Sequence, residues 1–101
     1  MPYLIDATDK PGQAELRQRH RPEHLAFLHR SLPRLLAAGA KLSDDGNTAL
    51  GSIYIVEVED RAGAEAFIAE DPYVKANLFR SVVITRWRKG FFNHESFIPK
   101  S

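Results

Sequence analysis

The sequence predicts an α+β domain of the ferredoxin-like type, with a βαββαβ order and an antiparallel sheet. Two observations carry this prediction. Short runs rich in β-forming residues alternate with helical patterns, in the order strand, helix, strand, strand, helix, strand. The clearest strand, residues 51–58, is apolar on both faces, which is typical of a central strand. Two helices cover one face of such a sheet. We therefore expect a second copy to cover the other face, giving a homodimer with a barrel-like interior.

The length and composition predict one globular domain, residues 1–101, with a core at 3–89 and an aromatic tail at 90–101. A net charge of +1 gives no indication of nucleic-acid or anionic-membrane binding. The absence of cysteine excludes disulfides, thiolate metal sites and a cysteine nucleophile. The sequence shows no basic leader and no apolar run of about 18 residues, so we expect a soluble, cytoplasmic protein.

The first half of the chain begins with a predicted strand at residues 3–8. Leu16, His20 and His24 then recur every four residues in a helical pattern, and we expect Pro22 to kink that helix or divide it in two. A strand beginning near Leu36 follows. Gly39 within it indicates a bulge or a close backbone approach. The polar run at 43–47 predicts a turn before the central strand.

The second half contains two predicted helix starts. Asp60 is expected to cap the second helix, and Asp71-Pro72 to begin a short third one. Aspartate accepts hydrogen bonds from the free N–H groups of a first turn, and proline suits the first helical position. Residues 81–87 form the predicted last strand. The three phenylalanines of the tail predict that it packs on its own domain or on a partner.

His24 and Asp71 are the candidate catalytic residues. An aspartate that accepts a hydrogen bond from one ring nitrogen sets the tautomer and makes the other nitrogen a base. Such a base suits proton abstraction beside a carbonyl or from a phenol. The spacing of the two residues alone favours a plain cap and an ordinary histidine. A purely structural pair, joining the two helical segments, is a further alternative.

Three other side chains are candidates for binding substrate. Ser52 and Tyr54 give residues 51–58 one more polar face, which we expect to line the barrel interior, with Ser52 donating to a substrate oxygen. Tyr73 is a candidate wall of an aromatic pocket. Arg21 is the candidate contact for an anionic group. Two of them have plain alternatives: Ser52 as a satisfied strand serine and Arg21 as a solvated helix charge.

The histidines also raise the question of a metal site. His20 and His24 stand four apart, a spacing that places two ligands on one helical face. No His-Glu-x-x-His pattern is present, however, and Pro22 disturbs the register between the two histidines. We predict no metal and no other cofactor.

Six segments together resemble the YCII-related domain family, in the order and spacing of that family, over residues 3 to about 89. They are Arg-Pro-Glu-His-Leu-Ala-Phe-Leu at 21–28, Leu-Ala-Ala-Gly-Ala at 36–40, Gly-Ser-Ile-Tyr-Ile-Val-Glu-Val at 51–58, Ala-Glu-Ala-Phe at 64–67, Asp-Pro-Tyr-Val-Lys-Ala-Asn-Leu-Phe at 71–79 and Val-Val-Ile-Thr-Arg-Trp-Arg at 82–88. The resemblance implies a dimeric α+β barrel and a site made from His24 and Asp71. It also associates some relatives with dehydrochlorination of aromatic breakdown products. The chain departs from the family pattern at Ala40, where proline is usual, and in its longer tail.

From these observations we expect a small lyase- or isomerase-type enzyme acting on a small aromatic or enol-carboxylate metabolite. His24 would be the general acid or base and Asp71 its orienting group. The alternative is a non-catalytic ligand-binding or accessory module on the same barrel. A third possibility is a partner-binding subunit that docks through the aromatic tail.

Overall fold

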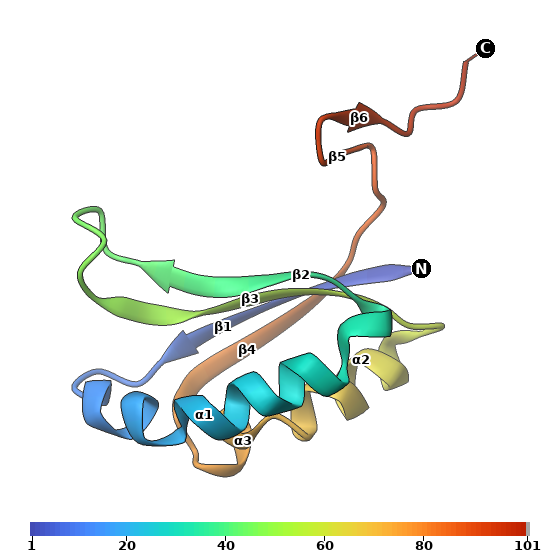
Figure 1. The fold of residues 1–101 in the computed structure, drawn as a ribbon. Coiled ribbons are helices and arrows are strands. Elements are labelled where there is room, and N and C mark those ends of the chain that lie inside the picture. Colours follow the sequence, from blue (N-terminus) through green and yellow to red (C-terminus); the bar gives the residue numbers. More distant parts are fainter. Residues whose placement is uncertain (101) are drawn as a thin grey trace.

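The computed structural model describes residues 1–100 and confirms the ferredoxin-like α+β class (Figure 1). In chain order the elements are β1 (Pro2–Asp9), α1 (Ala14–Arg30), the 3-10 turn η1 (Leu32–Arg34), β2 (Leu35–Leu42), β3 (Ala49–Glu57), α2 (Arg61–Ala69), α3 (Pro72–Lys75), β4 (Phe79–Arg86), β5 (Phe91–Phe92) and β6 (Glu95–Ser96).

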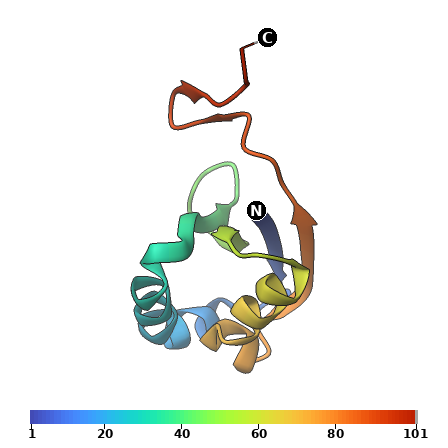
Figure 2. The same ribbon diagram turned by 90° about the vertical axis from the view of Figure 1, so that its right-hand side faces the viewer.

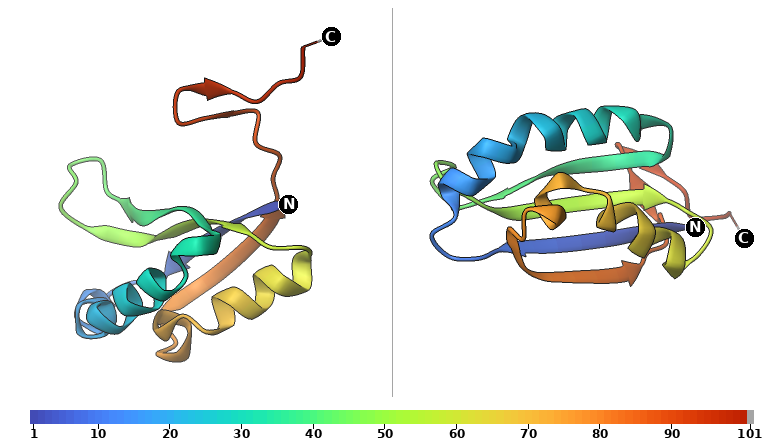
Figure 3. Two further views of the ribbon diagram at one scale, coloured as in Figure 1. Left: turned by 45° about the vertical axis from the view of Figure 1, so that its right-hand side comes forward. Right: turned by 90° about the horizontal axis from the view of Figure 1, so that it is seen from below.

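The first four strands form one antiparallel sheet in the order β2-β3-β1-β4. The predicted strand at residues 51–58 is therefore central, as its apolar faces indicated. One cross-strand row reads Leu35, Val56, Tyr3 and Arg86, and it marks one end of the sheet from edge to edge. The helices α1, α2 and α3 all lie against the same face, and the opposite face is left bare (Figures 1 and 3).

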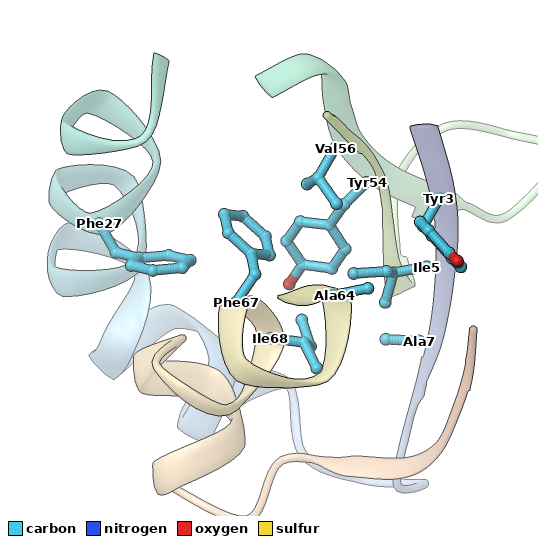
Figure 4. Close-up of a cluster of buried hydrophobic side chains, with 9 residues drawn as sticks. All are labelled: Tyr3, Ile5, Ala7, Phe27, Tyr54, Val56, Ala64, Phe67 and Ile68. Carbon is cyan, nitrogen blue, oxygen red and sulfur yellow. The ribbon is translucent and has the colours of Figure 1, made fainter. Parts of the chain in front are cut away.

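The core lies between the sheet and the helices. Alternate residues of the two central strands point into it and meet aromatic side chains from α1 and α2, because side chains alternate between the faces of a strand. Ala64 of α2 is fully buried and lets that helix approach the sheet closely. The nine buried hydrophobic residues that form this cluster are Tyr3, Ile5, Ala7, Phe27, Tyr54, Val56, Ala64, Phe67 and Ile68 (Figure 4).

Of the two expectations for Pro22, a kink or a divided helix, the division does not occur. Helix α1 runs without a break from Ala14 to Arg30 with Pro22 inside it. Proline removes only one helical hydrogen bond, the one that would reach the carbonyl of Gln18. Both Pro22 and Gln18 are exposed, so water can satisfy that carbonyl and the helix continues.

The expectation for Gly39 is also wrong. A Cβ at Gly39 would meet nothing within 4 Å, and the register shifts of β2 fall between Leu35 and Ala37 and between Lys41 and Leu42. The close backbone approach occurs instead at Gly51 of β3. A Cβ there would collide with the Ala7 carbonyl oxygen and with the Lys41 side chain.

Ser52 and Tyr54 do not line the bare face of the sheet, contrary to the expectation. Both are buried on the side that faces the helices. The residues that alternate with them, Ile53 and Ile55, face the other way and are partly exposed. On that bare side Lys41 reaches over Gly51 and donates to the carboxylate of Asp6 at 2.8 Å.

The tail forms a separate arm, residues 87–98, that stands away from its own domain on the side of the bare sheet face (Figures 1 and 2). Strands β5 and β6 pair as a small hairpin. Its turn residues Asn93 and His94 both have positive φ, the conformation of a tight two-residue hairpin turn. Phe91 is 72% exposed, so the tail does not pack on its own domain as one of the two expectations had it.

Candidate functional site

Asp71 is the N-cap of α3, as predicted. Its Oδ1 accepts a hydrogen bond from the backbone N–H of Tyr73 at 2.9 Å, and Pro72 occupies the first turn. The residue is completely buried. A buried carboxylate requires several donors, because an ionised group without partners in a protein interior is costly. The remaining lone pairs of Asp71 therefore determine which other side chains must gather around it.

Two side chains supply those donors. The hydroxyl of Tyr54 donates to Oδ2 of Asp71 at 2.6 Å, and Nδ1 of His24 lies 3.0 Å from each carboxylate oxygen. The structure thus brings together the two residues that the sequence singled out. Burial raises the pKa of Tyr54 far above its usual value, and the negative charge and hydrogen bond of Asp71 raise it further. Tyr54 therefore remains a protonated donor.

The tautomer of His24 follows from its partner. A carboxylate only accepts, so the proton between the two groups belongs to Nδ1, and Nε2 carries the free lone pair. Within residues 1–100, Nε2 has no hydrogen-bond partner in the protein. In that range, Oδ1 of Asp9 is the one fully buried side-chain N or O atom that lacks a hydrogen-bond partner. Nε2 also lacks a partner, so it is not fully buried and keeps some contact with solvent. The site thus contains a nearly buried histidine, 7% exposed, with one nitrogen held and one free.

The ring of Tyr73 fixes the plane of the imidazole. The two rings stack with centroids 4.0 Å apart and planes 15° from parallel. Burial raises the pKa of the Tyr73 hydroxyl, as does the charge of Asp71, while the positive charges of Arg17 and Arg21 oppose the rise. The predicted site residue Tyr73 is therefore part of the arrangement, packed against the histidine on the helix side of the sheet.

Arg17 is the site residue that sequence reasoning missed. Its Nε pairs with Asp9 at 2.8 Å, and its Nη2 donates to the Gly51 carbonyl at 2.6 Å and to Ser52 Oγ at 2.7 Å. Its guanidinium carbon also lies 4.7 Å from the centre of the Tyr73 ring. Among the arginines of α1, the sequence indicated only Arg21 as a site candidate. The available signal was its spacing, because a residue seven positions before His24 lies two turns away on the same face.

The other two predicted binding residues are placed differently. Ser52 is buried, and its hydroxyl oxygen accepts from Arg17. Arg21 is exposed, but it is close enough to influence the Tyr73 hydroxyl electrostatically. A cavity of about 450 Å³ lies beyond Arg17, at the start of α1, with Asp9, Lys10, Leu50 and Arg80 among its lining residues. Neither His24 nor Asp71 lines it, and in a single copy both residues are buried.

Among residues 1–100 there is no cluster of three or more histidine, aspartate or glutamate side chains placed to hold a metal ion. His20 points instead toward Glu23, with Nδ1 3.7 Å from the carboxylate. In the same range of residues, no helix combines the length and the apolar character that crossing a membrane requires.

The fold and the site define a small α+β protein with a histidine–carboxylate pair enclosed between its helices and its sheet. The chain belongs to the family described as the YCII-related domain, whose model matches residues 1–88.

The relatives are of similar size. Protein YciI of Escherichia coli is 37% identical over 98 residues, covering 90% of this chain and all of that one. An uncharacterized protein of Haemophilus influenzae is 36% identical with the same coverage. Among solved structures, a 5-chloro-2-hydroxyhydroquinone dehydrochlorinase from Burkholderia phenoliruptrix, in complex with 2,5-dihydroxybenzoquinone, is similar with a TM-score of 0.81 and 30% identity. The match covers 87% of this chain and 94% of that one.

Proposed function

We propose that this chain is a small lyase- or isomerase-type enzyme in which His24 transfers a proton and Asp71 orients it. The observation that carries the proposal is the double contact of Nδ1 with the carboxylate, which leaves Nε2 without a protein partner. A ring nitrogen held in this way can accept a proton from a phenol, an enol or a carbon beside a carbonyl. Proton abstraction of this kind begins both isomerisation and loss of HX.

The substrate class follows from the chemistry and from one relative. The similar Burkholderia enzyme is a dehydrochlorinase of a chlorinated hydroxyhydroquinone. Net loss of HX from a hydroxylated ring moves one proton from a hydroxyl oxygen to the halogen-bearing carbon. A second hydroxyl proton is released as the halide leaves with its bonding electrons. A single acid–base residue can perform both transfers, so we propose a small aromatic or enol-carboxylate substrate.

The proposed binding residues are Tyr73, Arg21 and Ser52. Tyr73 stacks on the imidazole and would pack near a planar substrate. Exposed Arg21 would contact an anionic oxygen of the ligand, and Ser52 would donate its hydroxyl proton. In this proposal Arg17 is a positioning residue, because its guanidinium already bonds to the protein on several sides.

The test is halide release from a chlorinated hydroxyhydroquinone by the native chain and by His24→Gln and Asp71→Asn. We expect each variant to lose about 10²- to 10⁴-fold in rate, the range of general acid–base catalysis. His29→Gln is the matched control, because His29 is exposed and bonds only to the Leu25 carbonyl among the described residues. Full activity in His24→Gln would contradict the proposal. It would also be contradicted if the native chain converted neither halogenated hydroxyhydroquinones nor enol carboxylates.

A second function, ligand binding without catalysis, is favoured by one observation. The histidine is nearly closed to solvent in a single copy, and the polar groups of Arg17, two turns earlier on α1, are already bonded to protein. Under this alternative 2,5-dihydroxybenzoquinone would shift the ring resonances of His24 in an NMR titration, while no substrate of either class would be converted. Binding together with turnover would instead support the enzyme.

We also propose that a second copy covers the bare sheet face. That face carries Val83, which is 58% exposed, together with the partly exposed Ile53 and Ile55. The contact of Lys41 with Asp6 and Thr8, at 2.8 and 2.7 Å, gives the face a paired polar centre rather than a free charge. Light scattering should give a mass in solution of twice the chain mass. In Val83→Lys that mass should fall to the mass of a single chain.

A further inference from the structure

We propose that the C-terminal arm, residues 87–98, clasps the second copy of the chain and seats its phenylalanines in an apolar groove beside β2 of that copy. The proposal rests on the homodimer proposed above and adds to it a specific contact. The family model ends at residue 88, so all of the arm except its first two residues lies beyond the matched domain. It is therefore a feature that the family resemblance does not explain.

The arm is built as a binding element that lacks its partner. Phe91, Phe97 and Ile98 are 72%, 41% and 54% exposed. The hairpin is ordered internally, since Phe97 N–H donates to the Gly90 carbonyl at 2.7 Å and Lys89 lies 4.0 Å from the centre of the Phe97 ring. An isolated two-stranded hairpin is at best marginally stable in water and normally needs a surface to pack on.

A surface of matching chemistry lies at the same end of the sheet. A groove of about 310 Å³ runs between α1 and β2, with Leu25, Leu28, Leu32 and Leu36 among its lining residues. Leu32 is 61% exposed. Exposed apolar surface of this kind marks an interaction site more often than a random surface does.

The sheet register relates the arm to the groove. Leu35 at the groove and Arg86 at the root of the arm end the same cross-strand row, on opposite edges of the sheet. Three strand spacings separate them, about 14 Å. A two-fold axis that lies between two facing sheets and parallel to their strands turns each sheet over without exchanging its ends. It therefore places β4 of one copy over β2 of the other, and the root of the arm over the end of the sheet that carries the groove.

The arm is long enough to make this contact. Facing sheets pack about 10 Å apart, and the five residues from Arg86 to Phe91 span about 16 Å when extended. The arm also leaves the domain on the side of the bare face, which is the side on which the second copy would sit (Figures 1 and 2). Because the axis is two-fold, both arms would make the same contact.

The test uses the absence of cysteine, which makes any introduced cysteine unique. The Glu95→Cys variant, with its cysteine in the hairpin and without ¹⁵N, carries a spin label. It is mixed with ¹⁵N-labelled native chain. We expect the amide signals of the groove, residues 32 and 34–38, to lose at least half of their intensity in the ¹⁵N-labelled copy. Asp44→Cys, in the turn at the other end of the sheet, is the matched control and should leave those amides unchanged.

The outcomes separate the arm from the dimer. A dimer by light scattering with no broadening of the groove overturns the arm contact and leaves the dimer in place. If the groove amides broaden only when the spin label and ¹⁵N are in the same chain, the arm docks on its own domain. That result also overturns the proposal. A monomer overturns both proposals.

A double-mutant cycle provides an independent measurement. Phe97→Ser and Leu32→Gln change exposed side chains, so both variants should fold. We expect each to weaken the dimer about tenfold, because each removes one side of an apolar contact. The double variant should be little weaker than either single variant. Fully additive losses would show that the two side chains do not meet.

Discussion

Tyr54→Phe tests the buried hydrogen-bond network of the site. The substitution keeps the ring in the core and removes only the hydroxyl that donates to Asp71 at 2.6 Å. A hydrogen bond to a charged group contributes about 1.5–3 kcal/mol. We therefore expect the free energy of unfolding at pH 8 to fall by about 2 kcal/mol. In a domain of this size such a loss lowers the midpoint of thermal unfolding by roughly 10 °C.

The same variant makes a prediction about pH. In the folded chain the pKa of Tyr54 is raised above its unfolded value, first by burial and then by Asp71. The stabilisation by the hydroxyl is therefore complete below the unfolded pKa of about 10 and is lost as the pH rises beyond it, by about 1.4 kcal/mol per pH unit. The difference in the free energy of unfolding between native and variant should shrink to about 0.6 kcal/mol at pH 11 and change sign at about pH 11.5.

Urea unfolding of both proteins at pH 8 and pH 11 measures this difference. The other ionisable side chains are the same in both proteins, so their contributions cancel to a first approximation. A difference that stays constant between the two pH values would refute the reasoning, because Tyr54 would then lose its proton equally easily in both states. Equal stability at pH 8 would show that the hydroxyl does not bond the carboxylate.

The remaining predictions concern the surroundings of the site. Gly51→Ala should cost at least about 2 kcal/mol in chemical unfolding, because its Cβ collides with the Ala7 carbonyl, whereas Gly39→Ala should be nearly neutral. Arg17→Met should cost up to about 3–5 kcal/mol, because it leaves the largely buried Asp9 carboxylate unpaired, and Asp9→Asn in the same chain should restore part of the loss. Asp71→Asn should move the ring proton of His24 toward Nε2, read from its ¹⁵N shifts, since an amide group can donate to Nδ1. Unchanged ¹⁵N shifts would show that Asp71 does not set the tautomer.

Much of the fold could be predicted from the sequence because the signals involved are local. Asp60 and Asp71 were recognised as caps because an aspartate before a helix has a short-range partner, the N–H two or three residues on. The strand at residues 51–58 was recognised as central because both of its faces are apolar. In each case the signal and the structure that it predicts lie within a few residues of each other.

The errors concern properties that depend on distant parts of the chain. Alternation along β3 distinguished two faces but did not show which one the helices cover, so Ser52 and Tyr54 were assigned to the wrong side. Whether Arg17 is buried or solvated depends on Asp9 and Ser52, which come from two other elements. Gly39 and Gly51 are equivalent as sequence signals, and only the position of a neighbouring strand distinguishes them.

Asp71 links the stability of the fold to the chemistry of the site. One of its oxygens begins α3 by accepting from Tyr73, and the same carboxylate holds His24 of α1 and Tyr54 of β3. Any substitution that frees the histidine therefore also leaves a helix start or a buried hydroxyl without its partner. Activity lost in Asp71→Asn must accordingly be compared with Tyr54→Phe, which weakens the same network without touching the imidazole. Only a loss that exceeds the one in Tyr54→Phe at equal folded fraction can be assigned to the orientation of His24.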